Sequence, residues 1–237
     1  MGEIYLKYIK FILIGIGFIF LIIFLLFLST NEYILGEIVL DKAYGDIDGD
    51  GTNELIVLNK APFHKFGSEV IIYRGINDMT EVYREDFSEL KPWKIDTGDV
   101  DRDGIYEVSV GVYKETIFHQ IMDKRPFIYS YRDNRLLPKW RGSRLSRPFT
   151  DYIFYDLDMD DSDEIISIEI LEDGKLILNS YKWIGFGIEG FLEGEIYDKI
   201  YGLHKGSELT VTVEKNGNKI NGRVVIKDNQ LLIERME

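Results

Sequence analysis

Three short segments of the chain carry carboxylates at a fixed spacing, and these are the residues best suited to chemistry. Each segment fits the pattern D-x-D-x-D-(G/D)-x-x-E followed by an apolar residue, beginning at Asp46, Asp99 and Asp156. A hard cation such as calcium takes about six to eight oxygen ligands, and carboxylates at positions 1, 3 and 5 of a curled loop can converge on one point. The pattern therefore predicts three cation-binding loops.

The other positions of the pattern serve the same purpose. Position 6 needs a residue that tolerates positive φ, which Gly51 and Gly104 do, and which Asp161 does as one of the few suitable non-glycine residues. The turn lets the carbonyl at position 7 face the ion, and the Glu at position 9 closes the cage. An EF-hand is excluded because position 12 holds no acid. The alternative to metal binding is a set of solvated turns.

The predicted ligands, with position 7 contributing its backbone carbonyl, are Asp46, Asp48, Asp50, Thr52, Glu54, Asp99, Asp101, Asp103, Ile105, Glu107, Asp156, Asp158, Asp160, Ser162 and Glu164. We expect two or three Ca²⁺ ions.

Short β-rich runs surround each loop, with turn residues between them. Four such runs per unit of about 50 residues are typical of a propeller blade. We therefore predict an all-β fold over residues 35–237, a small β-propeller of about four four-stranded blades. The alternative is an open or partial propeller. The expected blades are 35–87, 88–145, 146–191 and 192–237, the last without an acidic loop.

At these loops the sequence resembles the FG-GAP and VCBS repeat families, which include the calcium-binding blades of integrin alpha-subunit propellers. The carriers are GDIDGDGTNELIV (45–57), GDVDRDGIYEVSV (98–110) and YDLDMDDSDEIIS (155–167). The resemblance implies a β-propeller in which each metal loop joins the first two strands of a blade. It also implies that the aspartates and the glutamate of each loop are calcium ligands.

The N-terminus is strongly apolar. Residues 11–28 contain no charged side chain, Lys7 and Lys10 precede them, and Glu32 follows. We predict a transmembrane anchor over 11–30, with 1–10 in the cytoplasm and the rest outside, because cations favour the cytoplasmic side. The alternative is secretion after signal cleavage.

Composition excludes several functions. The 28 Lys and Arg against 41 Asp and Glu give a net charge of −13, which argues against nucleic acid as a partner. There is no Cys, and there are only 3 His. Neither a Gly-x-Ser-x-Gly nor a His-Glu-x-x-His motif is present. We therefore expect a binding or scaffold module for a protein or glycan ligand. The alternative is a hydrolase or lyase with structural metal.

One basic segment stands out from the acidic background. It offers cations for an anionic or glycan ligand and a Trp for stacking. The candidate ligand contacts are Lys139, Trp140, Arg141, Arg144 and Arg147. The alternative is that these residues neutralise the acidic loops and pack between blades.

Overall fold

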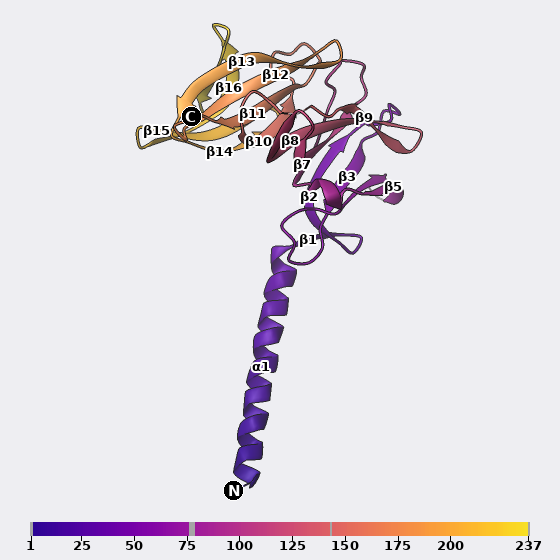
Figure 1. The fold of residues 1–237 in the computed structure, drawn as a ribbon, viewed down its shortest axis with the longest axis vertical. Helices are drawn as coiled ribbons and strands as arrows, with labels where there is room; N and C mark the ends of the chain where they lie inside the picture. Colours follow the sequence, from indigo (N-terminus) through magenta and orange to yellow (C-terminus); the bar gives the residue numbers. More distant parts are fainter. Residues whose placement is uncertain (1, 76–78, 143, 237) are drawn as a thin grey trace. The chain divides into compact units, whose positions relative to one another are not determined.

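The computed structural model describes residues 2–75, 79–142 and 144–236 (Figure 1). The chain divides into two compact units, residues 1–39 and 40–237. In the first unit, helix α1 (Gly2–Thr30) precedes β1 (Glu32–Ile34), which pairs antiparallel with the start of β2 (Glu37–Gly45). The two residues between these strands both have positive φ, as a two-residue hairpin turn requires.

The predicted membrane anchor is corrected by the structure. Among the described residues, no helix is long and apolar enough to cross a membrane. The predicted single-pass topology, with the N-terminus in the cytoplasm and the remainder outside, is corrected by the same finding.

In the part of the chain that the structure describes, seventeen strands form three sheets. The five-stranded sheet has the order β1-β2-β3-β4-β5, with β3 (Glu54–Asn59), β4 (Glu69–Arg74) and β5 (Thr80–Asp86). After a short 3₁₀ helix, η1 (Ser88–Leu90), the four-stranded sheet contains β6 (Lys94–Gly98), β7 (Glu107–Thr116), β8 (His119–Arg132) and β9 (Arg135–Trp140) in that order.

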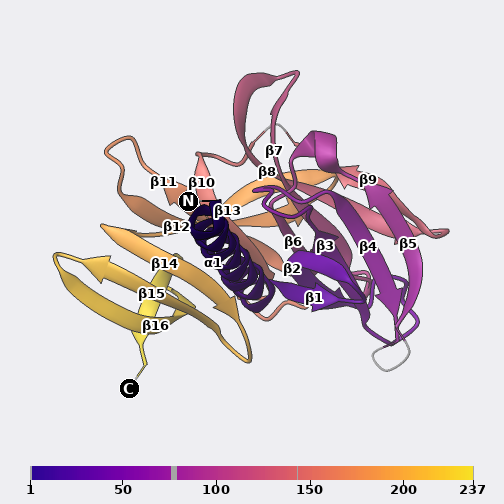
Figure 2. The ribbon, with the colours of Figure 1, turned by 90° about the horizontal axis from the view of Figure 1, so that it is seen from below.

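The third sheet has eight strands in the order β10-β11-β12-β13-β17-β16-β15-β14. Its strands are β10 (Phe149–Tyr155), β11 (Glu164–Ile170), β12 (Leu176–Ile184), β13 (Gly187–Tyr197), β14 (Lys199–Lys205), β15 (Leu209–Lys215), β16 (Asn218–Lys227) and β17 (Gln230–Arg235). Figure 2 shows its strands in orange to yellow.

The prediction of a four-bladed propeller is therefore wrong: the expected third and fourth blades form one sheet. Strand β13 runs through the expected blade boundary at 191/192, and it pairs in parallel with β17 at Gly194 and Leu231. A Cβ on Gly194 would lie 3.0 Å from the Leu231 carbonyl oxygen, so this close approach depends on glycine. The sheet also curls, since its edge strands β10 and β14 contact each other.

Runs of Ile, Leu and Val buried on both faces form inner strands such as β3, β4 and β11. One core cluster packs side chains of the first sheet against those of the second, including Ile56, Ile72 and Val110. A second cluster joins the four-stranded sheet to the third one through Ile128, Tyr152 and other residues. The remaining cluster lies within the eight-stranded sheet. Side-chain packing therefore connects the first sheet to the second and the second sheet to the third.

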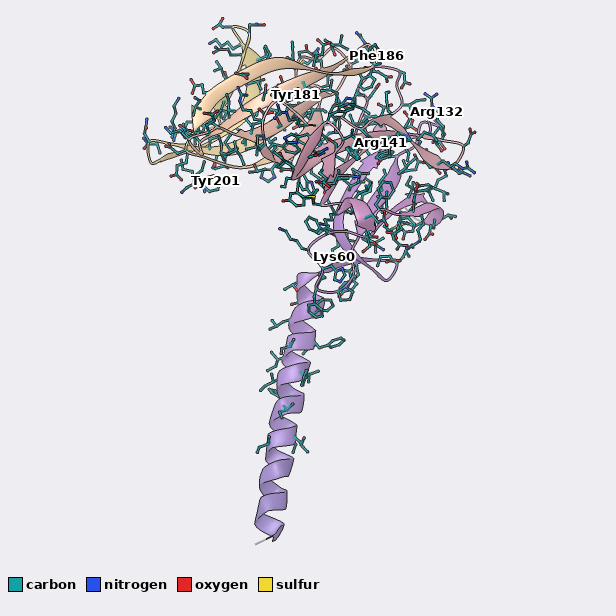
Figure 3. All side chains as sticks on the ribbon, in the orientation of Figure 1. Lys60, Arg132, Arg141, Tyr181, Phe186 and Tyr201 are labelled. Carbon is teal, nitrogen blue, oxygen red and sulfur yellow. The ribbon has the colours of Figure 1, made fainter. Side chains whose placement is uncertain are left out.

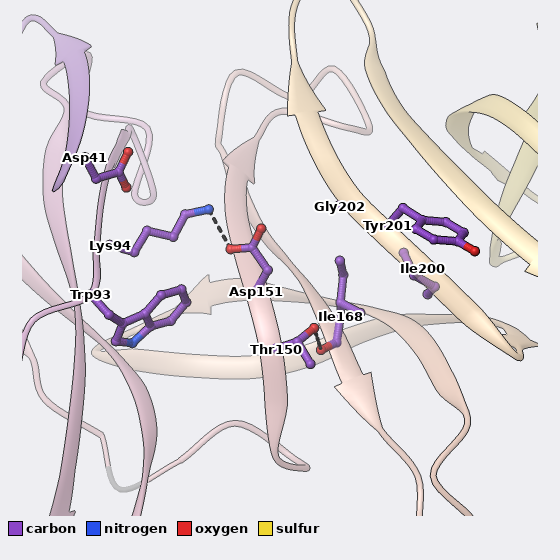
Figure 4. A pocket seen from close by; sticks show the side chains of 9 residues that line it. All are labelled: Asp41, Trp93, Lys94, Thr150, Asp151, Ile168, Ile200, Tyr201 and Gly202. Carbon is purple, nitrogen blue, oxygen red and sulfur yellow. Dashed lines mark hydrogen bonds and ion pairs between the residues drawn. The ribbon is translucent and has the colours of Figure 1, made fainter. Parts of the chain in front are cut away.

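Two aspartates, the partly buried Asp41 and the buried Asp96, tie strands of successive sheets together. Asp41 on β2 accepts a hydrogen bond from the Ile95 N–H of β6 at 3.0 Å. Asp96 on β6 likewise accepts one from the Phe154 N–H of β10 at 2.9 Å. A cavity of about 420 Å³ opens beside these strands, and an ion pair between Lys94 and Asp151 bridges it at 2.7 Å (Figure 4). These ties fix the strands from which the acidic loops start.

Candidate metal centres

The acidic loops join neighbouring strands of each sheet. Loop 1 (46–54) leads from β2 to β3, loop 2 (99–107) from β6 to β7, and loop 3 (156–164) from β10 to β11. We number the positions of each loop 1 to 9. In every case position 9 is the first residue of the following strand, which fixes the end of the loop in a sheet.

Position 1 folds each loop around its carboxylate. Asp46 accepts hydrogen bonds from the backbone N–H groups of positions 5 and 6 at 3.1 and 2.8 Å. Asp99 does so at 3.2 and 2.8 Å, and Asp156 at 3.1 Å for both. The Asp at position 5 accepts the N–H of position 7 in all three loops, at 2.9, 2.9 and 3.0 Å. The three loops therefore share one hydrogen-bonded frame.

Two positions of each loop, 4 and 6, have positive φ. At position 6 the values are 87° for Gly51, 83° for Gly104 and 66° for Asp161, as expected from the sequence. Position 4 was not foreseen: it has φ of 75° in loop 1, where it is Gly49, but also 61° and 60° in loops 2 and 3, where it is Arg and Met. The glycine of loop 1 was the only local signal for this second turn residue.

The position-9 glutamates, Glu54, Glu107 and Glu164, are almost completely buried. One carboxylate oxygen of each accepts the N–H of position 2, at 3.2, 3.2 and 2.9 Å. The Oε1 atoms of Glu54 and Glu164 are both buried. Among the described residues Glu54 Oε1 makes no hydrogen bond, whereas Glu164 Oε1 is contacted by the Lys182 ammonium group at 3.2 Å. Burial raises the pKa of Glu107 and of Glu164 to about 7, and it also raises the pKa of Glu54.

Each loop gathers three carboxylates whose oxygens lie within 4.8 Å of one another, so each could hold a metal ion. The groups are Asp46, Asp48 and Asp50; Asp99, Asp101 and Glu107; and Asp156, Asp158 and Glu164. The predicted ligands Glu54, Asp103 and Asp160 lie in the same loops but outside these groups. The backbone carbonyls of Thr52, Ile105 and Ser162 remain predicted ligands.

A cation from a neighbouring strand reaches each group of carboxylates. In loop 1, Arg74 bonds to Asp48 and lies 3.6 Å from Glu54 Oε1. In loop 2, Lys139 Nζ lies 2.5 Å from Asp101 and 2.6 Å from Glu107.

In loop 3, Lys182 Nζ lies 2.6 Å from Asp158, 2.7 Å from Asp160 and 3.2 Å from Glu164. The loop pattern did not point to Arg74 or Lys182. Lys139 was a candidate ligand contact with neutralisation of the acidic loops as the alternative, and its contacts with Asp101 and Glu107 confirm the alternative.

Strand register explains which cation arrives. The pairs Leu55↔Tyr73 and Ile165↔Tyr181 place the next residues, Arg74 and Lys182, opposite the position-9 glutamates. In the middle sheet the corresponding residue is Ser130, after the pair Val108↔Tyr129, and the cation comes instead from β9. For loops 1 and 3, a Tyr followed by Arg or Lys on the strand paired with the glutamate-bearing strand was therefore a usable sequence signal.

Successive loops are hydrogen-bonded to one another. The N–H of position 8 in loop 2, Tyr106, donates to the carbonyl of Asp46 at 2.9 Å. The equivalent N–H of loop 3, Asp163, donates to the carbonyl of Asp99 at 2.6 Å. Between loops 2 and 3 the Ser162 hydroxyl also donates to the Val100 carbonyl at 2.9 Å. The three candidate metal centres therefore form a connected row.

The structure separates the candidate ligand contacts of the basic segment. Lys139 belongs to loop 2, whereas Arg147 pairs with Glu169 at 3.2 Å and Glu193 at 2.9 Å. Arg141 and Arg144 are exposed; Figure 3 labels Arg141. These two arginines line different cavities. Arg144 shares one of about 320 Å³ with Trp140 and Tyr181, so only part of the predicted patch comes together.

Known protein families and curated proteins were compared with the chain. No family matches it, and no curated protein matches it. The resemblance of the loops to FG-GAP and VCBS repeats thus rests on the loop residues themselves.

Proposed function

We propose that this is a calcium-binding β-sheet protein whose three acidic loops each accept one Ca²⁺ ion. The observation that supports it best is the position-9 glutamate, a buried carboxylate at the base of each loop. In loop 1 the Oε1 atom of Glu54 makes no hydrogen bond in the described chain, and its ion-pair partner Arg74 stays 3.6 Å away. A buried carboxylate oxygen without a partner is costly, and a bound cation would remove that cost.

The donor set favours calcium over other metals. Every grouped side chain is a carboxylate, and the chain has no Cys. All-oxygen sites suit calcium or magnesium, whereas zinc prefers Cys and His. Loops that can add backbone carbonyls and water favour the larger and more adaptable coordination shell of calcium. Three ions would also offset six of the thirteen net negative charges.

We further propose that the rigid, metal-loaded sheets act as a binding or scaffold module for a protein or glycan ligand. The cavity lined by Trp140, Arg144 and Tyr181 supports this role, since it combines aromatic side chains with an exposed guanidinium group. An array of acidic and neutral glycans, probed with the wild type and with R144S, tests it. Loss of a signal with R144S but not with R132S would support the cavity as the contact.

The test of calcium binding is a calorimetric titration of the purified full chain with CaCl₂ at low ionic strength, together with melting curves in calcium and in chelator. We expect two or three binding events and a higher Tm in calcium, because an ion bound only by the folded state stabilises it. The variant D48N/D101N/D158N should lose the binding events. Absence of binding heat together with identical melting curves would overturn the proposal.

A further inference from the structure

Each acidic loop already contains one positive charge at its carboxylates, and the degree of engagement differs between loops. Lys182 contacts two of the three grouped residues of loop 3, Asp158 and Glu164. Lys139 contacts two of the three in loop 2, Asp101 and Glu107. In loop 1, Arg74 bonds to only one grouped residue. Loops 2 and 3 are therefore the ones in which a metal ion and the protein's own cation need the same oxygens.

The two lysines are also enclosed where they stand. Their side chains are only 13% and 19% exposed, against 45% for Arg74. An aromatic ring lies near each ammonium group: Trp183 has its centroid 5.3 Å from Lys139 Nζ, and Phe191 has its centroid 4.6 Å from Lys182 Nζ. Aromatic faces attract cations, and shielding from water strengthens the carboxylate contacts. The two ammonium groups are therefore shielded from solvent and held in place by the carboxylates and the aromatic rings.

We propose that Lys139 and Lys182 are resident cations of loops 2 and 3, and that they set the metal affinity of these loops by competing with the metal for its carboxylate ligands. This inference rests on the proposed calcium sites. A metal ion entering loop 3 must displace Lys182 from Asp158 and Glu164, because both cations cannot occupy the space between the same oxygens. Loop 1, with its exposed Arg74, fills first. Loops 2 and 3 keep their folded frame without metal.

The experiment compares the full-length wild type with K182M and K139M. Methionine keeps an unbranched chain of about the length of the lysine stem and removes the charge. Losing a hydrogen bond to a charged group changes an affinity about tenfold or more. We therefore expect one calcium site in each variant to tighten about tenfold or more, measured by titration with CaCl₂. In chelator each variant should melt below the wild type, and saturating calcium should abolish that difference.

The matched control is K215M. Lys215 forms an ion pair of similar length, 2.8 Å to Glu195, on an exposed surface outside the loops. This variant has the same change in net charge, and its calcium affinity should equal that of the wild type. A tightened site in K182M but not in K215M would separate local competition from a change in overall charge.

The possible results distinguish the two proposals. Calcium binding by the wild type with unchanged affinity in K182M and K139M would overturn the competition alone. Binding by the lysine variants but not by the wild type would support the competition and overturn calcium binding as a property of the native protein. No binding by any of them would overturn both.

Discussion

Loops 1 and 3 have the same backbone frame but reach it with different side chains. Loop 1 uses glycine at both positive-φ positions, and its cation is a half-exposed arginine. Loop 3 uses Met159 and Asp161 at these positions, and its cation is the enclosed Lys182. The comparison teaches that the carboxylates and their backbone hydrogen bonds define the frame. Glycine eases the turn, and in our proposal the partner cation sets how strongly the loop depends on an added metal.

The largest expected difference concerns the position-9 glutamates in chelator. E164A removes a buried carboxylate beside Lys182 and leaves the Leu157 N–H without its partner. Because the Leu157 N–H loses its acceptor and the enclosed Lys182 loses one of its three carboxylate partners, we expect a loss of about 3 kcal/mol in the free energy of unfolding. E54A should lose about 1–2 kcal/mol, since Arg74 can remain in water. Urea unfolding measures both, and equal losses would show that the two loops do not differ.

A second prediction concerns the ties that position the two loops. Burial raises the pKa of Asp96, which ties β10 and so loop 3, to about 6, against an ordinary value of 3.8; Lys205 and Lys94 oppose the shift. The folded state therefore takes up this proton more readily than the unfolded state. The contribution of Asp96 to stability is greatest at low pH and is lost as the pH rises from about 4 through 6.

The expected size is at most about 3 kcal/mol. Urea unfolding across pH 4 to 7 should show a flatter profile for D96N than for the wild type, with E172Q as an exposed control. The equivalent tie between the strands of loops 1 and 2 is Asp41, whose pKa burial also raises. If D96N kept the full slope, Asp96 would not be its source.

Exchanging the turn residues tests the role of glycine directly. A Cβ on Gly51 would meet no atom within 4 Å, so the cost of G51A is that of the left-handed backbone alone, about 1 kcal/mol. M159G should stabilise loop 3 by about 0.5–1 kcal/mol, because Met159 is exposed and loses no packing. Thermal melts in chelator check both variants. Changes of the same sign would contradict a shared frame.

The smallest effect is expected at the exposed cation. R74M should reduce stability by less than about 1 kcal/mol, because half-exposed ion pairs are well hydrated. Added salt should erase this difference, since screening acts most strongly on exposed charges. Melting curves at low and high NaCl concentration measure it. A loss of stability that persisted in high salt would show that the ion pair of Arg74 is shielded from solvent as that of Lys182 is.

Local features were predictable from the sequence, and long-range ones were not. The turn at position 6 and the grouping of nearby aspartates follow from residues a few positions apart. Lys139 is 38 residues from Asp101, and it arrives through the register of two hairpins, which no loop pattern encodes. The eight-stranded sheet was missed for a similar reason. Its joining pair, Gly194 and Leu231, depends on a glycine in β13 that looks unremarkable in sequence.

The hydrogen bonds that join the three loops into a row have a consequence for how the loops respond to ions. The Asp46 carbonyl is held by loop 2, and the Asp99 carbonyl by loop 3. Both carbonyls belong to position-1 residues, whose carboxylates are grouped for the metal. An ion that shifts one position-1 residue therefore pulls on the neighbouring loop through its backbone. Under the proposed calcium binding, the three loops would therefore fill cooperatively, because occupancy of one loop would change the free energy of filling the next.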